Sequence, residues 1–272
     1  MENCLARSRK RFDEFYDKYN KREFVHPDPL EFLYRYEDPR DREIAGLVAS
    51  SLAYGRVKQI LLNVEKVLKV LGESPFEFLK GPIALKRLER LLSGFKHRFT
   101  SGDEVALFLY GIKNALKKYS SLNECFLSRF NGKDETVLPA LIAFVSELSR
   151  NGHPPSLLPR PEKGSASKRL NLYLRWMVRK DDVDPGGWEG VPASKLIIPL
   201  DTHMHRVCRA LYLTGRKNAD LRSALDITSR FREINPSDPV KYDFSLTRPG
   251  IMNDKVLKAC LKEHFSLEKV YS

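Results

Sequence analysis

The segment VKQILLNVEKVLKVL, residues 57–71, decides the fold class of this chain. Its apolar side chains recur three and four positions apart, which is the spacing of one face of an α-helix; they are Val57, Ile60, Leu61, Val64, Val67, Leu68 and Leu71. Gly72 follows, and glycine is the residue that most often ends a helix. The segment therefore predicts an amphipathic helix over residues 57–71.

The same helical spacing returns along most of the chain. Ser101 and Glu104 form a capping box that begins a second helix, which runs through Leu116. Further helices are predicted over residues 137–150, 168–179, 202–213, 219–234 and 254–267. No segment shows a convincing alternation of apolar and polar residues between hairpin turns, so sheet is expected to be minor or absent. The fold is therefore predicted to be all-α, with loops rich in proline and glycine at residues 151–165 and 181–195.

Length and composition narrow the class of protein. A chain of 272 residues can form one large domain or two lobes, and 42% apolar residues exclude disorder. No apolar run approaches the roughly 20 residues of a membrane span, and no secretory signal begins the chain. A cytoplasmic protein is expected, associated with the nucleoid in a prokaryote. The four cysteines lie far apart without a CxxC motif, which argues against a zinc knuckle, an iron–sulfur cluster and a disulfide framework, so no cofactor is expected.

The charge balance favours a polyanionic partner. The chain holds 47 Lys and Arg against 35 Asp and Glu, a formal net charge of +12. Residues 160–217 alone carry 12 basic and 6 acidic side chains, so this segment is the predicted contact face for nucleic acid. The alternative is a generally basic surface that binds no ligand.

Asp201 lies where the run LIIPLDTHMHRVCRALYL, residues 196–213, passes from a loop into a helix. An aspartate at this position caps the helix, because its oxygens accept the unpaired first-turn N–H groups. The same carboxylate could also face a cleft and stabilise positive charge on a substrate. Both interpretations remain open from the residues alone.

Residues 199–207, PLDTHMHRV, resemble the VDTH…RV run of the helix-hairpin-helix DNA glycosylases, a superfamily that includes endonuclease III and the 8-oxoguanine glycosylases. In that superfamily the aspartate also ends a loop rich in glycine and proline. Residues 164–171, GSASKRLN, resemble the family's GVGxKxA hairpin, with Lys168 in the nucleophile position and with Ser165 and Ala166 departing from the pattern. The 33 positions from Lys168 to Asp201 are similar to the spacing in archaeal 8-oxoguanine glycosylases.

This resemblance implies a DNA repair glycosylase with AP-lyase activity. It implies a monomer that binds double-stranded DNA and excises a damaged base such as 8-oxoguanine, with Lys168 and Asp201 as its catalytic residues. It also implies two helical lobes with the catalytic cleft between them. Residues 40–165 would form one continuous lobe, and residues 1–39 and 166–272 the other.

A lysine suits this chemistry because a neutral amine can attack C1′ of the sugar, expel the base and hold the sugar as a Schiff base. Lys168 would therefore need a lowered pKa, through desolvation or through the nearby cations Lys163, Arg169 and Arg175. The alternative is a solvated lysine or a simple phosphate contact.

The resemblance extends to residues that would hold the DNA. The predicted DNA-contacting residues are Arg56, Lys163, Gly164, Arg169, His203 and Arg206. Near the N-terminal end of the chain, Leu52 and Tyr54 lie in a helix junction that resembles the stretch filling the gap left by an extruded base. An apolar or aromatic wedge and a nearby cation would serve that role. Core packing for Leu52 and a surface turn for the others is an equally open alternative.

Two further side chains are candidates for recognition of an extruded base. Trp188 lies in a polar loop, where a large aromatic side chain needs an explanation, and Asp243 could accept hydrogen bonds from the edge of a base. Trp176 is assigned to the core instead, because its helix carries other large apolar residues. Tyr242 and Phe244 could also stack on such a base.

His203 and His205 do not form a metal site. Side chains two positions apart on a helix point roughly 200° away from each other, so they cannot share an ion. No metal is expected, and His205 is predicted to be exposed.

Two other classes of function compete with the enzyme. One is a protein that binds nucleic acid on the same scaffold without catalysis, which predicts a steep salt dependence and indifference to lesions. The other is a helical scaffold for protein partners, which predicts little affinity for nucleic acid.

Overall fold

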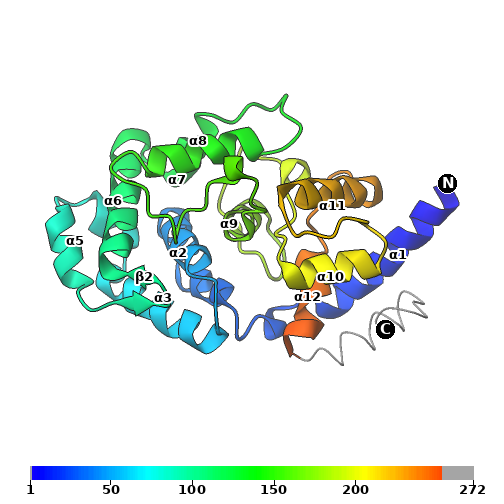
Figure 1. The fold of residues 1–272 in the computed structure, drawn as a ribbon, viewed down its shortest axis with the longest axis horizontal. Helices are drawn as coiled ribbons and strands as arrows, with labels where there is room; N and C mark the ends of the chain where they lie inside the picture. Colours follow the sequence, from blue (N-terminus) through cyan, green and yellow to red (C-terminus); the bar gives the residue numbers. More distant parts are fainter. Residues whose placement is uncertain (1, 253–272) are drawn as a thin grey trace.

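Helices make up nearly all the regular structure of residues 2–252, the part of the chain that the computed structural model describes (Figure 1). The α-helices are α1 (Glu2–Tyr19), α2 (Pro39–Ser51), α3 (Val57–Leu71), α4 (Pro75–Lys80), α5 (Leu85–Leu91), α6 (Gly102–Tyr119), α7 (Leu122–Leu127), α8 (Leu138–Leu148), α9 (Lys168–Val178), α10 (Thr202–Ala210), α11 (Leu221–Ile234) and α12 (Asp243–Met252). Short 3-10 helices are η1 (Arg22–Phe24), η2 (Pro29–Arg35), η3 (Pro161–Lys163) and η4 (Ala193–Lys195). The all-α prediction is confirmed.

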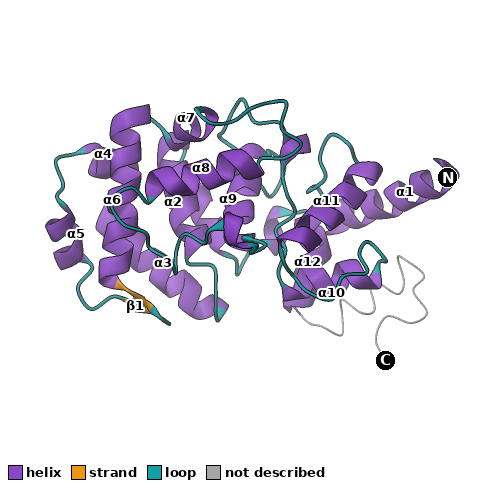
Figure 2. Ribbon diagram, turned by 45° about the horizontal axis from the view of Figure 1, so that its top comes forward, coloured by secondary structure: helices purple, strands orange, loops and turns teal. Residues whose placement is uncertain are grey.

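The sheet is limited to one small hairpin, as the sequence predicts. Strands β1 (Lys96–His97) and β2 (Thr100–Ser101) pair in antiparallel orientation, with Lys96 opposite Ser101 and His97 opposite Thr100. Figure 2 shows this hairpin among the helices.

The helix predicted over residues 57–71 is confirmed as α3, and the other predicted helices differ from α6, α8, α9, α10 and α11 by a few residues at their ends. Gly72 ends α3 with φ +76, in a conformation that favours glycine. The helix predicted over residues 254–267 lies outside the described residues. The short helices α4, α5 and α7 are missed by the spacing rule, because six or seven residues hold too few turns to show a period.

Capping side chains fix where several helices begin. The Ser101 Oγ accepts the Glu104 N–H at 3.3 Å, as the predicted capping box requires. The Glu104 carboxylate does not return to Ser101, since its Oε1 accepts the Ser156 N–H at 2.7 Å. Half of the capping box therefore ties α6 to the loop that follows α8.

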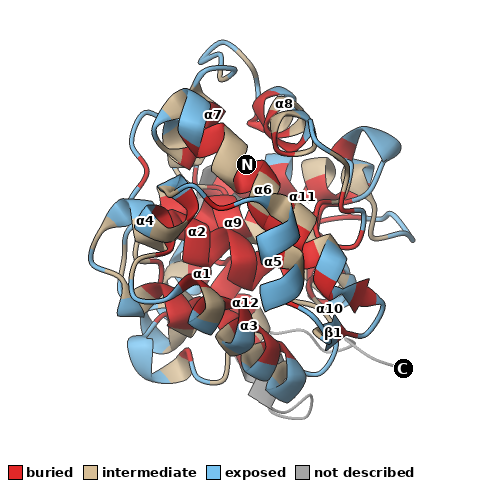
Figure 3. Ribbon diagram, turned by 90° about the vertical axis from the view of Figure 1, so that its left-hand side faces the viewer, coloured by how far each residue is buried: buried red, intermediate tan, exposed pale blue. Residues whose placement is uncertain are grey.

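The centre of the molecule is the contact between α2 and α9, which both appear almost wholly buried in Figure 3. Gly46 on α2 lies in this contact, where a Cβ would be at ordinary van der Waals distance, 3.4 Å, from the Met177 Sδ and the Tyr173 ring, and 3.2 Å from the Leu33 Cδ2. On one side of this pair lie α3 to α8, and on the other lie α1, α10, α11 and α12 (Figure 1). Helix α1 packs against α11 and α12, so the start of the described chain joins its end.

One continuous apolar core runs through both groups of helices. The division into lobes at residues 40 and 165 therefore stays a prediction. No helix in the described part of the chain is long and apolar enough to cross a membrane.

Candidate functional site

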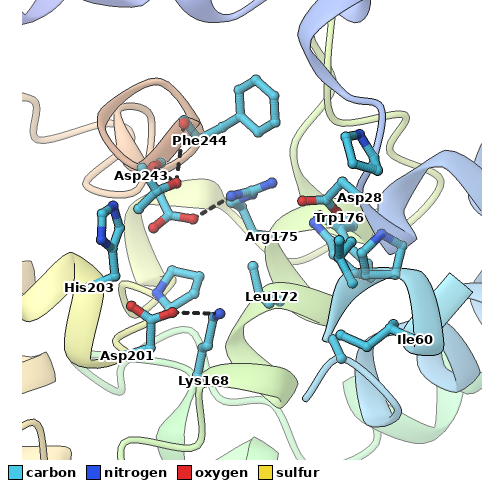
Figure 4. Close-up of a pocket in the computed structure, with 16 residues that line it drawn as sticks. Asp28, Ile60, Lys168, Leu172, Arg175, Trp176, Asp201, His203, Asp243 and Phe244 are labelled. Atoms are coloured by element: carbon cyan, nitrogen blue, oxygen red, sulfur yellow. Dashed lines mark hydrogen bonds and ion pairs between the residues drawn. The ribbon is translucent and has the colours of Figure 1, made fainter. Parts of the chain in front are cut away.

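Lys168 and Asp201 meet although 33 positions separate them in the sequence. Lys168 is the first residue of α9, and Asp201 is the N-cap of α10. The Lys168 Nζ lies 2.7 Å from the Asp201 Oδ2 (Figure 4). Each side chain keeps about a third of its surface exposed, 35% for Lys168 and 34% for Asp201, so the pair is open to a ligand.

Asp201 is a helix cap and a cleft residue at once. Its Oδ1 accepts the Met204 N–H at 2.7 Å, which is the hydrogen bond of an N-cap, while its Oδ2 faces Lys168. Burial opposes ionisation of this carboxyl, but the Lys168 ammonium and the Met204 N–H together hold the pKa of Asp201 below its usual value. Asp201 is therefore a carboxylate at neutral pH.

The turn before α9 determines where Lys168 emerges. Ser167 has a left-handed backbone with φ +47, and the Ser165 Oγ accepts its N–H at 3.2 Å. The Asn171 Nδ2 donates to the Ala166 carbonyl at 3.0 Å. These bonds close a tight turn, so the chain enters α9 with Lys168 directed at the start of α10.

A cavity of about 210 Å³ begins at this pair and passes between the two groups of helices. Its apolar walls come from the segments around η2, α3, α9 and α12, and they include Pro27, Pro29, Ala53, Val57, Ile60, Leu172, Pro199 and Phe244. Sites for drug-sized ligands span roughly 300–1,000 Å³, so this cavity fits a smaller group such as one ring or two fused rings.

An ionic wall closes the cavity opposite Lys168. The Arg175 guanidinium contacts Asp243 and lies 3.1 Å from the Asp184 carboxylate, and all three residues are buried (Figure 4). Burial raises the pKa of Asp243 to about 6, although Arg175 opposes this shift. Arg179 extends the network to Asp184 and to further carboxylates behind the cavity.

Trp176 contributes the indole of the cavity wall. Its side chain is 1% exposed, and its Nε1 is buried without a hydrogen-bond partner in the described residues. A buried N–H without an acceptor costs free energy, so what Trp176 offers the cavity is the face of its ring. Asp28 lines the same cavity and offers carboxylate oxygens, and burial raises the pKa of that carboxyl.

A shallower groove of about 590 Å³ meets the cavity at Lys168 and Asp201. Gly164, Ser165 and Ser167 form part of its rim, together with Tyr54, Gly55, Ala219 and Asp220. The Gly164 carbonyl accepts the Leu221 N–H at 3.0 Å, which fixes the turn before α9 against the start of α11. The predicted catalytic pair therefore lies where a deep cavity opens into a broad groove.

The sequence matches the family described as "Protein of unknown function (DUF2400)" over residues 28–252. The chain belongs to the DUF2400 family. No curated protein and no solved structure matches it.

Two predicted site residues of this DUF2400 protein lie in its core instead. Leu52 is 1% exposed, so it cannot act as a wedge without unfolding. Trp188 is also buried, among Phe126, Phe144 and Tyr173, and its Nε1 donates to the Glu43 Oε2 at 2.8 Å. The structure therefore does not bring Trp188 to the cavity, and the tryptophan that lines it is Trp176.

Arg169, a predicted DNA contact, lines the groove, and its guanidinium is also bound within the protein. Its guanidinium donates to the Ser156 carbonyl at 2.6 Å and to the Ser51 carbonyl, and lies 4.9 Å from the centre of the Tyr54 ring. Burial lowers the pKa of this guanidinium. Arg169 thus fixes Tyr54 and ties α9 to the end of α2.

The β1–β2 hairpin presents an aromatic side chain that was not among the residues predicted from the sequence. Phe99 is 69% exposed and stacks on Tyr54, with ring centres 5.1 Å apart. The Tyr54 hydroxyl donates to the His97 carbonyl at 3.1 Å and contacts Thr100, so Tyr54 is anchored. A single Phe in a turn has no sequence pattern that would mark it as a site residue. Phe99 becomes a candidate because it stacks on Tyr54 beside the groove.

The remaining predicted contacts lie around the groove and α10. Arg56, Lys163 and Arg206 are exposed, and His203 lines the cavity. His205 is buried rather than exposed, because its Nε2 bonds the Arg216 carbonyl at 3.1 Å. Within residues 2–252 of this DUF2400 protein, no group of three or more His, Cys, Asp or Glu could hold a metal ion.

Proposed function

We propose that this protein is a DNA glycosylase with AP-lyase activity, which excises a damaged base from double-stranded DNA. The observation that carries the proposal is the 2.7 Å contact between Lys168 and Asp201 at the mouth of a cavity lined by an indole. The two side chains that resemble the catalytic pair of the helix-hairpin-helix glycosylases are therefore within reach of one substrate atom.

The proposed reaction begins when the Lys168 ammonium passes a proton to the Asp201 carboxylate. The free amine attacks C1′ while the bond from C1′ to the base breaks, and the base leaves with the electron pair and takes up the proton held by Asp201, which becomes a carboxylate again. The ammonium now bound to C1′ passes a proton to the ring oxygen O4′ as the C1′–O4′ bond breaks, which gives a protonated Schiff base. Loss of a proton from C2′ then expels the 3′ phosphate. Once it has returned this proton, the Asp201 carboxylate stabilises the positive charge on the sugar and on the Schiff base.

The cavity supports the proposal by its size and chemistry. An extruded base would lie between apolar walls that include the Trp176 indole, with the Asp28 and Asp243 carboxyl groups as polar partners for its edge. We propose a damaged purine such as 8-oxoguanine as the base. Phe99 on Tyr54 would fill the gap that extrusion leaves in the duplex.

Borohydride trapping tests the proposal, because reduction of the Schiff base leaves protein covalently joined to DNA. Wild-type protein is expected to form an adduct with a duplex that contains a lesion or an abasic site. Lys168→Gln is expected to form none, whereas Lys180→Gln, at an exposed lysine outside the cavity, should trap like wild type.

Two results would overturn the proposal that this protein is a glycosylase. One is the absence of an adduct with every common lesion and with an abasic site, and the other is equal trapping by Lys168→Gln. Tight DNA binding that ignores lesions and survives Asp201→Asn would favour the non-catalytic nucleic-acid-binding protein. Little affinity for DNA at low salt would favour a scaffold for protein partners.

A further inference from the structure

Tyr212 occupies a backbone position that normally belongs to glycine. Helix α10 ends at Leu211 in a Schellman motif, in which the Tyr212 N–H donates to the Arg209 carbonyl at 3.1 Å and the Leu213 N–H to the Cys208 carbonyl at 2.9 Å. The first residue after the cap is left-handed in this motif, and here it is Tyr212 with φ +58. A left-handed conformation is strained for a bulky side chain.

The Tyr212 side chain has no packing in the described core that would compensate for this backbone strain. Tyr212 is 81% exposed, more than any other large apolar or aromatic residue on the surface of the described chain. A strained residue that packs against almost nothing points to a role outside the fold.

Four exposed cations flank Tyr212 in the sequence, and one of them, Arg206, contacts the His203 Nδ1 at 3.3 Å. Arg206 and Arg209 are exposed on α10, and Arg216 and Lys217 are exposed on the loop that follows. None of these four side chains makes an ion pair with a carboxylate in the part of the chain that the structure describes. We call these four residues and Tyr212 the α10 stripe.

The α10 stripe is held in place and leads to the groove. His205 bonds the Arg216 carbonyl, and the Thr214 hydroxyl donates to the Asp226 Oδ2 at 2.7 Å, so the loop is fixed from beneath. The same loop continues to Ala219 and Asp220 on the groove rim. At about 1.5 Å per helical residue, Tyr212 lies roughly 17 Å beyond Asp201 along α10.

We propose that the α10 stripe binds single-stranded DNA that flanks the cavity, with an unpaired base stacked on Tyr212. Cations along a backbone and an aromatic ring for base stacking are the two parts of a single-strand site. The bases of a duplex are already stacked and leave no free face for a side chain. The proposal rests on the DNA binding proposed above but not on its chemistry, and it makes a partly single-stranded strand the preferred substrate.

Fluorescence anisotropy with the full chain tests the stacking step, with a labelled 15-nucleotide single strand and a 15-base-pair duplex as probes. Tyr212→Gly is expected to weaken single-strand binding by about five- to one-hundred-fold, the range of one lost base stack, and to change duplex binding by less than about two-fold. Tyr212→Phe keeps the ring and should bind like wild type.

The same variants separate binding from folding. Tyr212→Gly removes the left-handed strain, so its melting temperature should equal or exceed that of wild type. Leu91→Ser replaces an exposed apolar side chain at the end of α5, far from α10 in Figure 1, and should leave binding unchanged.

Salt titration tests the cations. Arg209→Gln combined with Arg216→Gln should lower the slope of log affinity against log salt by about 1.4, because each phosphate contact on a single strand contributes about 0.7. Lys86→Gln with Arg90→Gln on α5 removes the same charge elsewhere and should leave the slope unchanged.

The proposal is overturned if Tyr212→Gly binds the single strand within two-fold of wild type, or if duplex binding falls as much as single-strand binding. These outcomes are distinct from failure of the enzyme. If binding depends on Tyr212 but no borohydride adduct forms, the single-strand site is supported and the glycosylase proposal is rejected. If an adduct forms but Tyr212→Gly has no effect, the glycosylase proposal is supported and the single-strand site is rejected.

Discussion

At the scale of single residues, the two oxygens of Asp201 do different work. Oδ1 caps α10 through the Met204 N–H, and Oδ2 meets the Lys168 ammonium. Capping needs only a hydrogen-bond acceptor, whereas stabilisation of a cationic sugar needs charge. Replacement by asparagine therefore separates the two functions.

Asp201→Asn is expected to keep the fold and lose the reaction. Asparagine caps as well as aspartate, so the free energy of unfolding should fall by no more than about 1 kcal/mol. Loss of the charge should lower the single-turnover rate of base release by about 10²–10³-fold. Asp38→Asn is the matched control, since Asp38 also caps a helix and pairs with a cation, Arg40, outside the cavity. Equal loss of rate in both variants would remove Asp201 from the chemistry.

The two tryptophans give a second prediction at this scale. The Trp176 N–H has no partner in the described chain, whereas the Trp188 N–H bonds Glu43. Trp176→Phe should therefore cost less stability than Trp188→Phe, which leaves a buried carboxylate short of a donor at a cost of about 1–3 kcal/mol. Base release should show the opposite order, with the larger loss in Trp176→Phe. Thermal unfolding and single-turnover kinetics on both variants measure the two orders, and a common order for both quantities would contradict it.

At the scale of helices and loops, local patterns predict what local contacts decide. The spacing in residues 57–71 and the cap at Asp201 depend on neighbours within a few positions, and both are found in the structure. Trp188 escapes such rules because its acceptor, Glu43, lies 145 positions away. His205 escapes them because the loop after α10 folds back to offer the Arg216 carbonyl.

The meeting of Lys168 with Asp201 is a different case. No spacing rule places the start of α9 beside the start of α10, and the expectation that they meet came from resemblance to a family. The cavity wall could not be predicted either, since Trp176, Asp28 and Asp243 come from three distant segments. Which side of Trp176 faces a cavity depends on packing that no single segment encodes.

Glu43 links α2 to the start of α7, and its protonation gives a prediction about the stability of this contact between helices. Its carboxylate accepts the Leu122 N–H at 2.7 Å, the Asn123 N–H at 3.0 Å and the Trp188 N–H. Burial nevertheless raises the pKa of Glu43 from 4.5 to about 7, against the opposing effect of these donors. Between about pH 4.5 and 7 the folded state therefore holds a proton on Glu43 that the unfolded state releases.

That shift fixes the sign of a pH dependence. The stabilisation by the bound proton is complete below pH 4.5 and is lost as pH rises to about 7, with a total on the order of 3 kcal/mol. Glu43→Gln cannot titrate, so its stability should change less than that of wild type between pH 4.5 and 7. Urea unfolding of both proteins across this range measures the difference. Parallel curves would mean that the carboxylate stays ionised in the fold.

At the scale of the whole molecule, the basic side chains predicted to contact DNA fall into two groups, those exposed to solvent and those buried in ion pairs. Residues 160–217 hold 12 basic side chains, but two of them, Arg175 and Arg179, form buried ion pairs with Asp184 and Asp243. Composition counts those cations as surface charge, although they neutralise carboxylates inside the protein. Only cations that face solvent can release counterions from DNA.

The salt dependence of duplex binding should therefore follow exposure and pairing rather than the net charge of +12. Arg56, Lys163 and Arg206 are exposed and make no ion pair with a carboxylate in the described chain, so replacement of each by Gln should lower the slope of log affinity against log salt by about 0.9. Arg230 already pairs with Glu233 at 3.1 Å, and Arg230→Gln should leave the slope unchanged. Anisotropy titrations between about 50 and 200 mM salt resolve such changes. If all four variants lower the slope equally, DNA is held by the general charge of the protein and not by the groove.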